Sequence, residues 1–419
     1  MLSERLFAQR RLPMKSPHFT AHQASKALGI TLPTLYAYVS RGLIRSEATV
    51  GSKRTRRYRA EDVHVLKQRK DLRRNPAKIV EGALHWGEPV MESAITLIAA
   101  GQVYYLGHNV VSLSTNRTIE EVAALIWTGD FAPAAELFGT KATLPPRCLA
   151  MRKQLRDLTT VEGFQVIVPL AAADDLAACD LRPTSVAQAG ARIVRLLAAF
   201  AAKDRIQGKN IAQTLQEAWV PAKQQAAQLI NTALILCADH ELNVSSFAAR
   251  CVASAGSSPY AVVTAGLAAL QGIKHGRTSE RIEALLQEAC TPGGVRKAMI
   301  ARLKRGGRIP GFGHPLYPDG DPRGRELLAL VAKIFPKSPA VAFAAAGAEE
   351  ALKLIGERPS VDFGLVIAAR ALGLPPDGAI TLFAIGRTVG WIGHAIEQYR
   401  RDRIIRPRAR YVGETPVQA

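Results

Sequence analysis

Apolar residues recur at helical spacing along most of the chain, and glycine and proline separate the apolar segments from about residue 83 onward. Thr118 and Glu121 have the spacing of a capping box at the start of one such segment, which runs to Gly129. Strict alternation of apolar and polar residues is rare, and a short exception at 102–111 predicts a small hairpin. The pattern therefore predicts a mostly α-helical body.

The amino-terminal segment follows another pattern, which predicts two short helices and a ribbon. Thr20 is placed to cap a helix over 21–28. Thr31 is placed to cap a second helix, which Gly42 ends. The basic run 53–59 comes next and predicts one strand of a two-stranded ribbon with a basic tip.

A third helix is predicted over 60–70, and the charged, proline-containing stretch 71–78 has the composition of a linker. Residues 1–75 are therefore expected to form one domain. Two stretches of it, SKALGITLPTLYAYVSRGLI and RTRRYRAEDVHVL, resemble the winged helix-turn-helix of MerR-type regulators and excisionases. In such a module the second helix enters the major groove of duplex DNA and the wing contacts phosphates. The residues that the resemblance places near DNA are Thr34, Tyr36, Ala37 and Arg41 on the second helix and Lys53, Arg54, Arg56 and Arg57 on the wing.

The formal charge of +20 is concentrated in the same segment, because residues 1–80 hold 18 Lys and Arg against 5 Asp and Glu. Such an asymmetry indicates a polyanionic partner, for which duplex DNA is the candidate. Two alternatives stay open. The basic residues can form an ordinary solvated surface, or the module can dock on the rest of the chain or on another protein.

The five cysteines are widely spaced and form no C-x-x-C pair. That usage argues for a reducing compartment and against a disulfide framework or a zinc module. No run of about 18 apolar residues is present, so no transmembrane helix is expected. Residues 1–15 lack the apolar core of a signal peptide. We therefore expect a cytoplasmic protein that does not associate with membranes.

Several short motifs in the second half of the chain contain residues suited to catalysis or anion binding. A lone histidine on a helical chain is more often a hydrogen-bonded core residue than a catalyst, so no single motif is specific. The motifs are ADHELN at 238–243, LQGIKHG at 270–276, GGRIPGFGH at 306–314, DPR at 321–323, VDF at 361–363, LFAIGR at 382–387 and RPRARYVG at 406–413.

In their order and spacing these motifs resemble the citrate synthase family. The stretch GFGHPLYPDGDPR is the most specific, with a glycine-rich turn, a histidine and an arginine nine residues beyond it. The resemblance covers about 83–413 and implies a large helical domain built from 76–278 and 379–419, with a small domain over 279–378. It also implies a two-fold dimer and an enzyme that joins an acyl-CoA, acetyl-CoA above all, to oxaloacetate.

The chemistry of such a reaction explains the residue types. A proton beside a thioester carbonyl is too weakly acidic to leave unaided at neutral pH. A positioned carboxylate removes it while a nearby donor stabilises the enolate oxygen. The resemblance implies that Asp362 is this base and His275 this donor, and that His314 polarises the carbonyl of the oxo acid.

Oxaloacetate is a dicarboxylate, and arginine binds carboxylates in a planar, bidentate manner. The resemblance assigns this task to Arg323, Arg387 and Arg406, the last from a second subunit, with His240 as a further contact. The turn residues expected around the CoA adenine are Arg308, Ile309, Pro310, Gly311 and Gly313. His394 is expected to be structural. No metal and no resident cofactor is implied, since CoA arrives with the substrate.

The sequence also departs from the family pattern. Arg277 stands where a glycine is common, and Pro315, Pro318 and Asp319 stand where basic residues that hold CoA are common. These departures leave the acyl group open, so a product such as 2-methylcitrate is an alternative to citrate. Two other functions stay open. One is a DNA-binding regulator whose body senses a ligand, and the other is a lyase that cleaves a citryl-CoA-type thioester.

Overall fold

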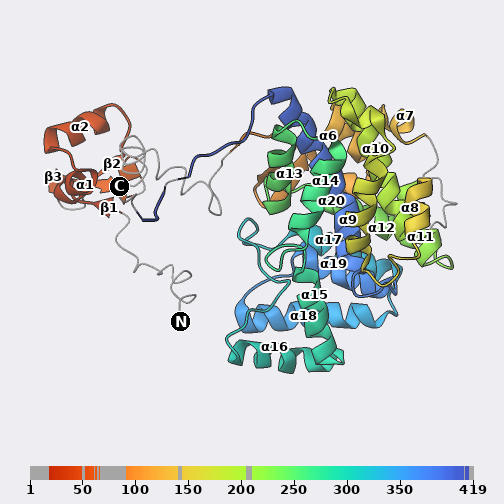
Figure 1. Cartoon of the computed structure of the whole chain (residues 1–419). Helices are drawn as coiled ribbons and strands as arrows, with labels where there is room; N and C mark the ends of the chain where they lie inside the picture. Colours follow the sequence, from red (N-terminus) through yellow and green to blue (C-terminus); the bar gives the residue numbers. More distant parts are fainter. Residues whose placement is uncertain are drawn as a thin grey trace. The chain divides into compact units, whose positions relative to one another are not determined.

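The computed structural model of the chain separates into two compact units, Met1–Glu92 and Ser93–Ala419 (Figure 1). The boundaries predicted inside the second unit, after residues 278 and 378, stay predictions. The predicted linker at 71–78 lies outside the described residues. The residues that the structure describes are 18–49, 52–60, 62, 63, 66, 91–139, 144–203, 210–409 and 411–414.

The amino-terminal unit has the two predicted helices and the predicted ribbon. Thr20 caps α1 with a complete capping box, and Thr31 caps α2. The described strands form a three-stranded antiparallel sheet in the order β1-β3-β2, to which β1 adds a strand that was not predicted. The bounds are β1 His18–Phe19, α1 Ala21–Leu28, α2 Leu32–Ser40, β2 Ser46–Thr49 and β3 Ser52–Arg59.

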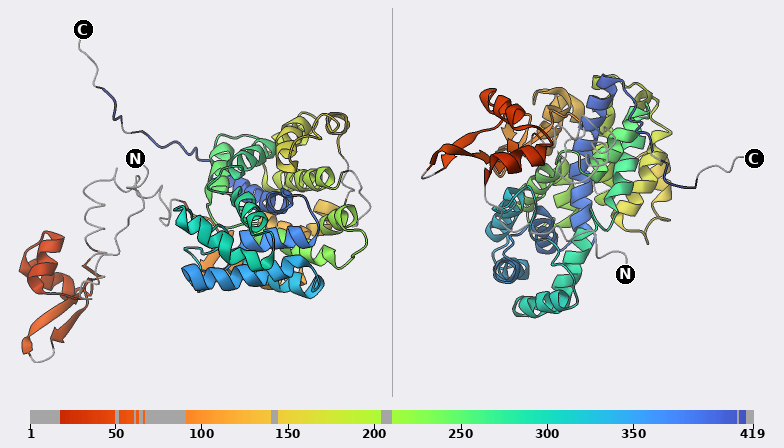
Figure 2. Two further views of the ribbon diagram at one scale, coloured as in Figure 1. Left: turned by 90° about the horizontal axis from the view of Figure 1, so that it is seen from below. Right: turned by 90° about the vertical axis from the view of Figure 1, so that its left-hand side faces the viewer.

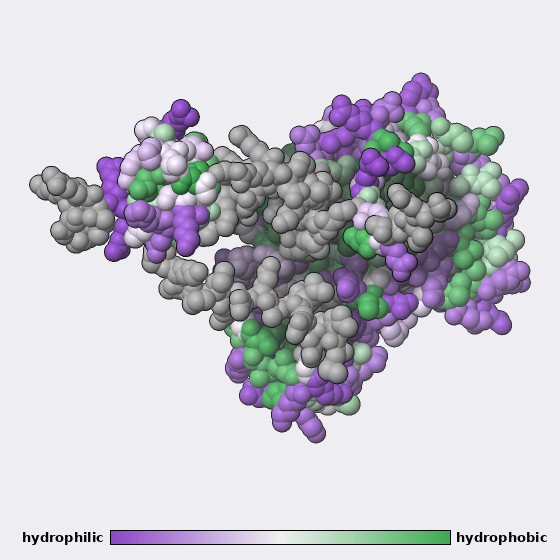
Figure 3. Space-filling model, turned by 60° about the vertical axis from the view of Figure 1, so that its left-hand side comes forward, coloured by the Kyte–Doolittle hydropathy of each residue, from purple (hydrophilic) through white to green (hydrophobic). Residues whose placement is uncertain are grey.

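This unit has a small hydrophobic core of its own. Its buried members come from both helices, the sheet and the region of the third predicted helix, and they are Ala24, Leu28, Leu35, Ile44, Tyr58 and Val63. Of the helix predicted over 60–70, the described residues Ala60, Asp62, Val63 and Leu66 are helical. Asp62 pairs with Arg45 at 2.7 Å and ties this region to the start of the ribbon. Hydrophilic residues border the unit on the face drawn in Figure 3.

The body begins with a small antiparallel sheet, β4 Thr96–Ala99, β5 Gln102–Tyr105 and β6 His108–Asn109. The predicted hairpin over 102–111 is therefore present as β5 and β6, but it ends at Asn109. Its last two residues belong to a helix, because the Asn109 side chain accepts a hydrogen bond from the Ser112 backbone N–H and caps α5.

The rest of the body is helical, and the predicted capping box of Thr118 and Glu121 is present at the start of α6. The helices of the first half are α5 Val110–Asn116, α6 Ile119–Thr128, α7 Ala134–Phe138, α8 Pro146–Met151, α9 Thr160–Ala172, α10 Pro183–Ala201, α11 Ile211–Trp219 and α12 Ala226–Cys237. Those of the second half are α13 Val244–Ser254, α14 Pro259–Leu270, α15 Thr278–Ala289, α16 Val295–Lys304, α17 Pro322–Ile334, α18 Pro339–Ile355, α19 Val361–Ala371 and α20 Gly378–Arg401.

Helix α20 is the central helix of the body and packs against α10, α12, α13 and α14 (Figure 2). Glycine allows close approach here, because a Cβ at Gly266 of α14 would meet the Trp391 ring at 2.5 Å. By length and composition α20 is the one described helix apolar enough to cross a membrane, which the sequence pattern had not indicated. Its apolar window is wholly buried inside the body.

Helices α15 to α19 pack mainly on one another at one end of the body (Figure 1). They join the remaining helices through contacts of α17 with α12 and of α19 with α20. After α20 the described residues 403–409 form no helix or strand. The Ile405 N–H donates to Oγ of Ser254 at 3.0 Å and holds the start of this segment on α13. The carboxy-terminal end of the chain leaves the helical body in the views of Figure 2. The candidate site described next contains residues from both groups of helices.

Candidate active site

The glycine-rich turn is paired with the segment that precedes α19. The backbone N–H of Gly313 donates to the carbonyl of Arg358 at 2.8 Å, and the N–H of Ser360 donates to the carbonyl of Gly311 at 2.9 Å. Gly311 and Gly313 have φ values of +86° and +78°, in the region that favours glycine. A Cβ at Gly311 would also meet Ile282 at 2.7 Å. This pairing holds the residue after Gly313, which is His314, beside the start of α19.

Asp321 ties the other end of the same loop to α19. Its carboxylate caps α17 and accepts hydrogen bonds from the Arg323 backbone at 3.0 Å, from Arg323 Nε at 3.0 Å and from Arg323 Nη2 at 2.9 Å. The same carboxylate accepts from the Val361 N–H at 3.0 Å. Burial alone would raise the pKa of Asp321, but the Arg323 guanidinium and these hydrogen bonds hold it below its usual range.

Asp362 is the second residue of α19, next to Val361. Part of its surface stays accessible, but the protein encloses the carboxyl enough for desolvation to raise its pKa to about 6, against the lowering effect of Arg323 and Arg387. A carboxylate with a raised pKa is a stronger base than one in water, and it is still ionised at neutral pH. These are the properties that the predicted proton abstraction requires.

His314 lies at the end of the glycine-rich turn as a neutral imidazole. Burial, with a further contribution from Arg323, lowers its pKa to about 4. Its Nδ1 accepts a hydrogen bond from the Leu316 N–H at 3.2 Å. The ring proton is therefore on Nε2, where it can be donated to a carbonyl oxygen.

His240 lies within reach of His314, with the two ring centroids 5.2 Å apart. It follows α12, and the residue before it, Asp239, is fixed by a hydrogen bond from its N–H to Tyr105 Oη at 3.1 Å. The residue after it, Glu241, has a φ of +53°. Burial lowers the pKa of His240 well below its usual value, so this imidazole is neutral as well.

Tyr317 was not among the predicted site residues, yet the structure places it between three of them. Its Oη lies 2.7 Å from Nε2 of His240, and its ring lies 4.9 Å from the ring of His314. The Arg323 guanidinium lies 5.4 Å from the same ring. Its position between His314 and Arg323 in the chain was the one available signal.

His275 follows α14, and its Nε2 lies 2.9 Å from Oγ of Ser245 on α13. Burial, with a contribution from Arg387, lowers the pKa of His275 to about 4. Its ring meets Phe383 edge-on at 6.0 Å. The Arg387 guanidinium lies 4.5 Å from that same phenyl ring, so Phe383 contacts both predicted site residues.

Arg387 on α20 is buried, with 2% of its surface exposed. Its Nε donates to the Cys237 carbonyl at 2.7 Å. Within the described part of the chain no carboxylate pairs with this arginine. Burial consequently lowers the pKa of Arg387 from its usual value. A buried guanidinium that lacks a protein anion is suited to bind an anionic ligand.

Arg323 differs from Arg387, because Asp321 already neutralises it inside the protein. The ion pair occupies the edge of the guanidinium formed by Nε and Nη2, and the Tyr317 ring lies 5.4 Å from its Cζ, so Nη1 remains to meet a ligand. Arg406 lies in the segment after α20, one residue beyond Ile405, and is exposed. Its predicted role in a second subunit stays a prediction.

The residues expected around the CoA adenine lie together in the glycine-rich turn, with Arg308 exposed and Ile309, Pro310 and Gly311 buried. His394, predicted to be structural, is fully buried and pairs with Asp239 at 3.1 Å. Arg277 is half-buried directly before α15, 3.6 Å from Glu280 of that helix.

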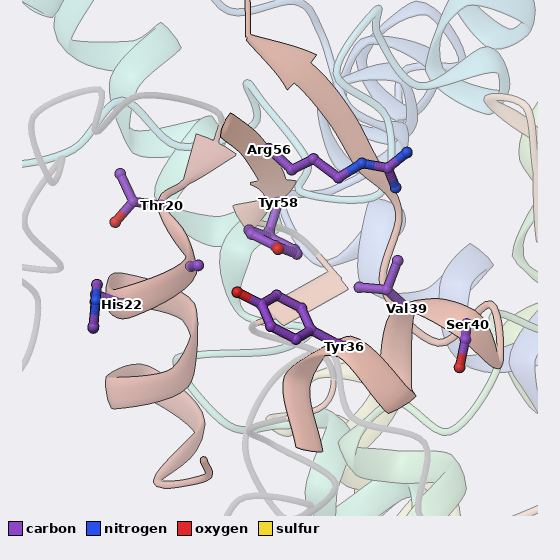
Figure 4. Close-up of a pocket in the computed structure, with 8 residues that line it drawn as sticks. Thr20, His22, Tyr36, Val39, Ser40, Arg56 and Tyr58 are labelled. Carbon is purple, nitrogen blue, oxygen red and sulfur yellow. The ribbon is translucent and has the colours of Figure 1, made fainter. Parts of the chain in front are cut away.

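The amino-terminal unit contains a pocket bounded by α1, α2 and β3 (Figure 4). Tyr36 and Arg56, both predicted to meet DNA, point into it, and Nη1 of Arg56 is held at 2.9 Å from Oγ of Ser46. The lining residues are Thr20, Ala21, His22, Tyr36, Val39, Ser40, Arg56 and Tyr58. The Tyr36 hydroxyl and the Arg56 guanidinium are donors suited to a phosphate oxygen.

The other predicted DNA contacts lie outside this pocket. Thr34 is in the first turn of α2 and hydrogen-bonds Thr31 at 2.8 Å, while Arg41 lies exposed at the end of that helix. Arg57 is exposed on β3. Lys53 and Arg54 belong to the same strand, and their side chains lie outside the described residues.

The body site therefore combines one carboxyl of raised pKa, neutral imidazoles and two buried arginines. Such a set can remove a proton beside a carbonyl, donate hydrogen bonds to carbonyl oxygens and hold a dianion. It combines the predicted residues His240, His275, His314, Arg323, Asp362 and Arg387.

Two family models match the chain. The model of the carboxy-terminal domain of citrate synthase matches residues 83–408. The model of MerR helix-turn-helix regulatory proteins matches residues 19–76. Each match falls on the segment for which the corresponding resemblance was predicted.

Individual relatives agree with the first model. Citrate synthase 2 of Bacillus subtilis is 28% identical over 348 residues, which cover 77% of this chain and 93% of the relative. The 2-methylcitrate synthase of Shewanella oneidensis is 29% identical over 371 residues, covering 81% and 97%. Among solved structures, Thermoplasma acidophilum citrate synthase in ternary complex with carboxymethyl coenzyme A and oxaloacetate has a TM-score of 0.72 at 25% identity, over 79% of this chain and 96% of that one.

Proposed function

Because this chain belongs to the citrate synthase family and is a citrate synthase-type enzyme, we propose that it condenses acetyl-CoA with oxaloacetate and hydrolyses the product to citrate and CoA. The observation that supports this proposal best is the single neighbourhood formed by Asp362, His314 and Arg387. Proton abstraction, carbonyl polarisation and anion binding each require one of these three groups. The structure of a relative with a CoA analogue and oxaloacetate agrees with the choice of substrates.

In the first step the Asp362 carboxylate removes a proton from the methyl group of the thioester. The electron pair of that C–H bond moves toward the carbonyl oxygen, and the neutral His275 imidazole donates a hydrogen bond to it. A neutral donor suits this task, because the imidazole stabilises the enolate oxygen through a hydrogen bond and does not have to be protonated first. Water has limited access to these groups, so each interaction is stronger than in solution.

In the second step the enolate carbon attacks the keto carbon of oxaloacetate. The new bond places negative charge on the keto oxygen, toward which His314 directs its Nε2 proton. Arg387 and Arg323 hold the carboxylates and orient the keto group. Water then cleaves the thioester of the bound citryl-CoA, which releases citrate and the thiol of CoA.

A thiol-release assay with oxaloacetate and a panel of acyl-CoAs tests the proposal. We expect turnover with acetyl-CoA that depends on oxaloacetate. Faster turnover with propionyl-CoA would instead make the enzyme a 2-methylcitrate synthase, which the Shewanella oneidensis relative supports as the second candidate. CoA release from citryl-CoA alone, with no condensation, would favour the lyase.

For the amino-terminal unit we propose binding to duplex DNA, supported by the MerR match, the basic composition and the pocket that contains Tyr36 and Arg56. Affinity should then fall steeply with salt, because each neutralised phosphate releases counterions. Arg56→Ala should reduce that salt slope by about one unit, the change expected for one lost phosphate contact. Absence of binding to both random and self-promoter DNA at roughly 50 mM salt would contradict the proposal.

We also propose that two chains form a dimer in which Arg406 of each subunit completes the site of the other. The exposed segment that carries Arg406 supports this arrangement. Light scattering measures the mass directly. If the proposal holds, mixed dimers of Arg406→Leu and Asp362→Asn chains should recover part of the activity that each variant lacks alone.

A further inference from the structure

Three groups proposed to bind the oxo acid contact one side chain, Tyr317. Its hydroxyl lies 2.7 Å from Nε2 of His240, and the rings of His314 and Tyr317 lie 4.9 Å apart. The Arg323 guanidinium lies 5.4 Å from the Tyr317 ring. At 2% exposure Tyr317 is as deeply buried as Arg323 and Arg387. The tyrosine is thus at the same depth as the arginines that are proposed to hold the substrate.

The hydrogen-bonding capacity of this hydroxyl is only partly used. A phenol can donate one hydrogen bond and accept two. Tyr105 shares its proton between the Ile235 and Asp239 carbonyls and accepts from the Asp239 N–H, all at 3.0–3.1 Å. Tyr317, within the described residues, has His240 as its hydrogen-bond partner. A buried hydroxyl with spare capacity next to a substrate site is suited to meet a substrate oxygen.

The protonation states of the pair determine what the hydroxyl can do. Burial keeps His240 neutral and raises the pKa of Tyr317, so the phenol keeps its proton at all physiological pH values. When His240 carries its proton on Nε2, it donates to Tyr317 Oη. The phenol proton then points elsewhere and is available as a donor. In this arrangement no charge is formed and each group has a defined role.

We propose that the Tyr317 hydroxyl is a further hydrogen-bond donor to the oxo acid, and that His240 orients this hydroxyl through the 2.7 Å contact of its Nε2. The inference rests on the proposed function, because it requires an oxo acid in this site. It gives His240 a second role, the orientation of Tyr317, beside its expected contact with the oxo acid. It also adds a substrate contact that the family resemblance did not imply.

Tyr317→Phe is the direct test, because it removes the hydroxyl and keeps the ring against His314 and Arg323. A hydrogen bond to a charged partner is worth roughly 10- to 100-fold in affinity. We therefore expect the Kd for oxaloacetate, measured by calorimetry, to rise about 10-fold or more. The KM for the acyl-CoA and the melting temperature should change little. Tyr260→Phe is the matched control, because it removes another buried tyrosine hydroxyl, bonded to Asp175 at 2.8 Å.

A double-mutant cycle tests the orienting role and does not depend on one variant alone. If His240 orients Tyr317, the effects of His240→Gln and Tyr317→Phe on oxaloacetate binding should be less than additive. Additive effects would overturn the orienting role. An unchanged oxaloacetate Kd in Tyr317→Phe, or an equal loss for oxaloacetate and CoA, would overturn the substrate contact. A wild-type protein that binds no oxaloacetate would overturn the proposed function, and the inference with it.

Discussion

Oγ of Ser245 lies 2.9 Å from Nε2 of His275 and 2.7 Å from Oδ1 of Asn243. The hydroxyl has one proton for these two acceptors, and it also receives a hydrogen bond from Trp391 Nε1 at 3.2 Å. When the proton points to His275, the imidazole carries its own proton on Nδ1. When it points to Asn243, the proton of His275 is on Nε2 and is donated to the serine oxygen, so it is not available to the substrate. The orientation of one hydroxyl thus selects the tautomer of the proposed enolate donor.

The role proposed for His275 requires the serine proton to point to Nε2. Ser245→Ala should therefore lower kcat, because it removes the donor that favours the Nδ1–H tautomer of His275. Loss of an orienting hydrogen bond costs roughly 1–3 kcal/mol, or about 5- to 150-fold in rate. Steady-state kinetics with saturating oxaloacetate measures the effect. Ser246→Ala, on the same helix α13, is the control, because this buried hydroxyl has no hydrogen-bond partner among the described residues. An unchanged kcat in Ser245→Ala would show that the serine does not select the tautomer.

Asp362→Asn should keep the fold and oxaloacetate binding but lose turnover by roughly 10²–10⁴-fold, the usual effect of removing a positioned base. The variant has the same shape but cannot accept the proton. Calorimetry with oxaloacetate and a thiol-release assay separate the two effects. Asp319→Asn, an exposed carboxyl in the loop before α17, is a matched control. Near-normal turnover of Asp362→Asn would remove this residue from the mechanism.

Arg387→Leu should weaken oxaloacetate binding far more than CoA binding. A substrate carboxylate without its charged partner in a desolvated site costs about 2–5 kcal/mol. Because no carboxylate among the described residues pairs with Arg387, its replacement leaves no such charge unpaired, and the melting temperature should change little. The exposed Arg156, replaced in the same way, controls for the lost charge. Equal weakening of both ligands would indicate a general disturbance of the site.

The pH dependence of activity should follow Asp362. Its carboxyl must be ionised to accept a proton, and its pKa is raised to about 6. As the pH falls through this value the base is lost, and kcat/KM should drop by about tenfold per unit. His275 and His314, whose pKa values are about 4, stay neutral over the same range. A pH–rate profile that is flat between pH 5 and 7 would contradict the assignment of the base.

Stability should also depend on pH through these histidines, whose pKa values fall from 6.5 in the unfolded chain to about 4. The unfolded state binds their protons more readily, so their stabilising contribution is present above pH 6.5 and is lost as the pH falls toward 4. Each contributes a loss of about 2 kcal/mol by pH 5. Thermal melts from pH 7 to 5 should therefore show a smaller decrease for His275→Gln than for the wild type.

Much of the fold could be predicted from local signals. Thr20, Thr31 and Thr118 begin helices where the sequence indicated, because capping uses residues adjacent in the chain. The mostly helical body, the winged helix-turn-helix and the family were predicted correctly, and the family models confirm both segments. Motif spacing was sufficient for these conclusions. The assigned roles of the individual site residues stay predictions.

What the sequence could not provide are contacts between segments far apart in the chain. Strand β1 is two residues long, and only its pairing with β3 makes it a strand. Tyr317 has no helix or strand pattern around it. Its proposed role depends on its hydrogen bond with His240, which is 77 residues away in the chain. The Ser245 hydroxyl next to His275 is likewise a product of the packing of α13 beside α14. Each of these features becomes visible only when the chain is folded.

The bond of one carboxylate, Asp321, to both Arg323 and the Val361 backbone has a consequence for changing substrate choice. A replacement of Arg323 alone leaves the buried Asp321 carboxylate without its cation and weakens the start of α19. A change of specificity at this position is therefore accompanied by a loss of stability. Arg387 forms no ion pair with a carboxylate among the described residues, and its Nε donates to the Cys237 backbone carbonyl. Laboratory evolution toward oxo acids with a neutral tail should therefore accept its first mutations at Arg387 and reach Arg323 only through paired changes with Asp321.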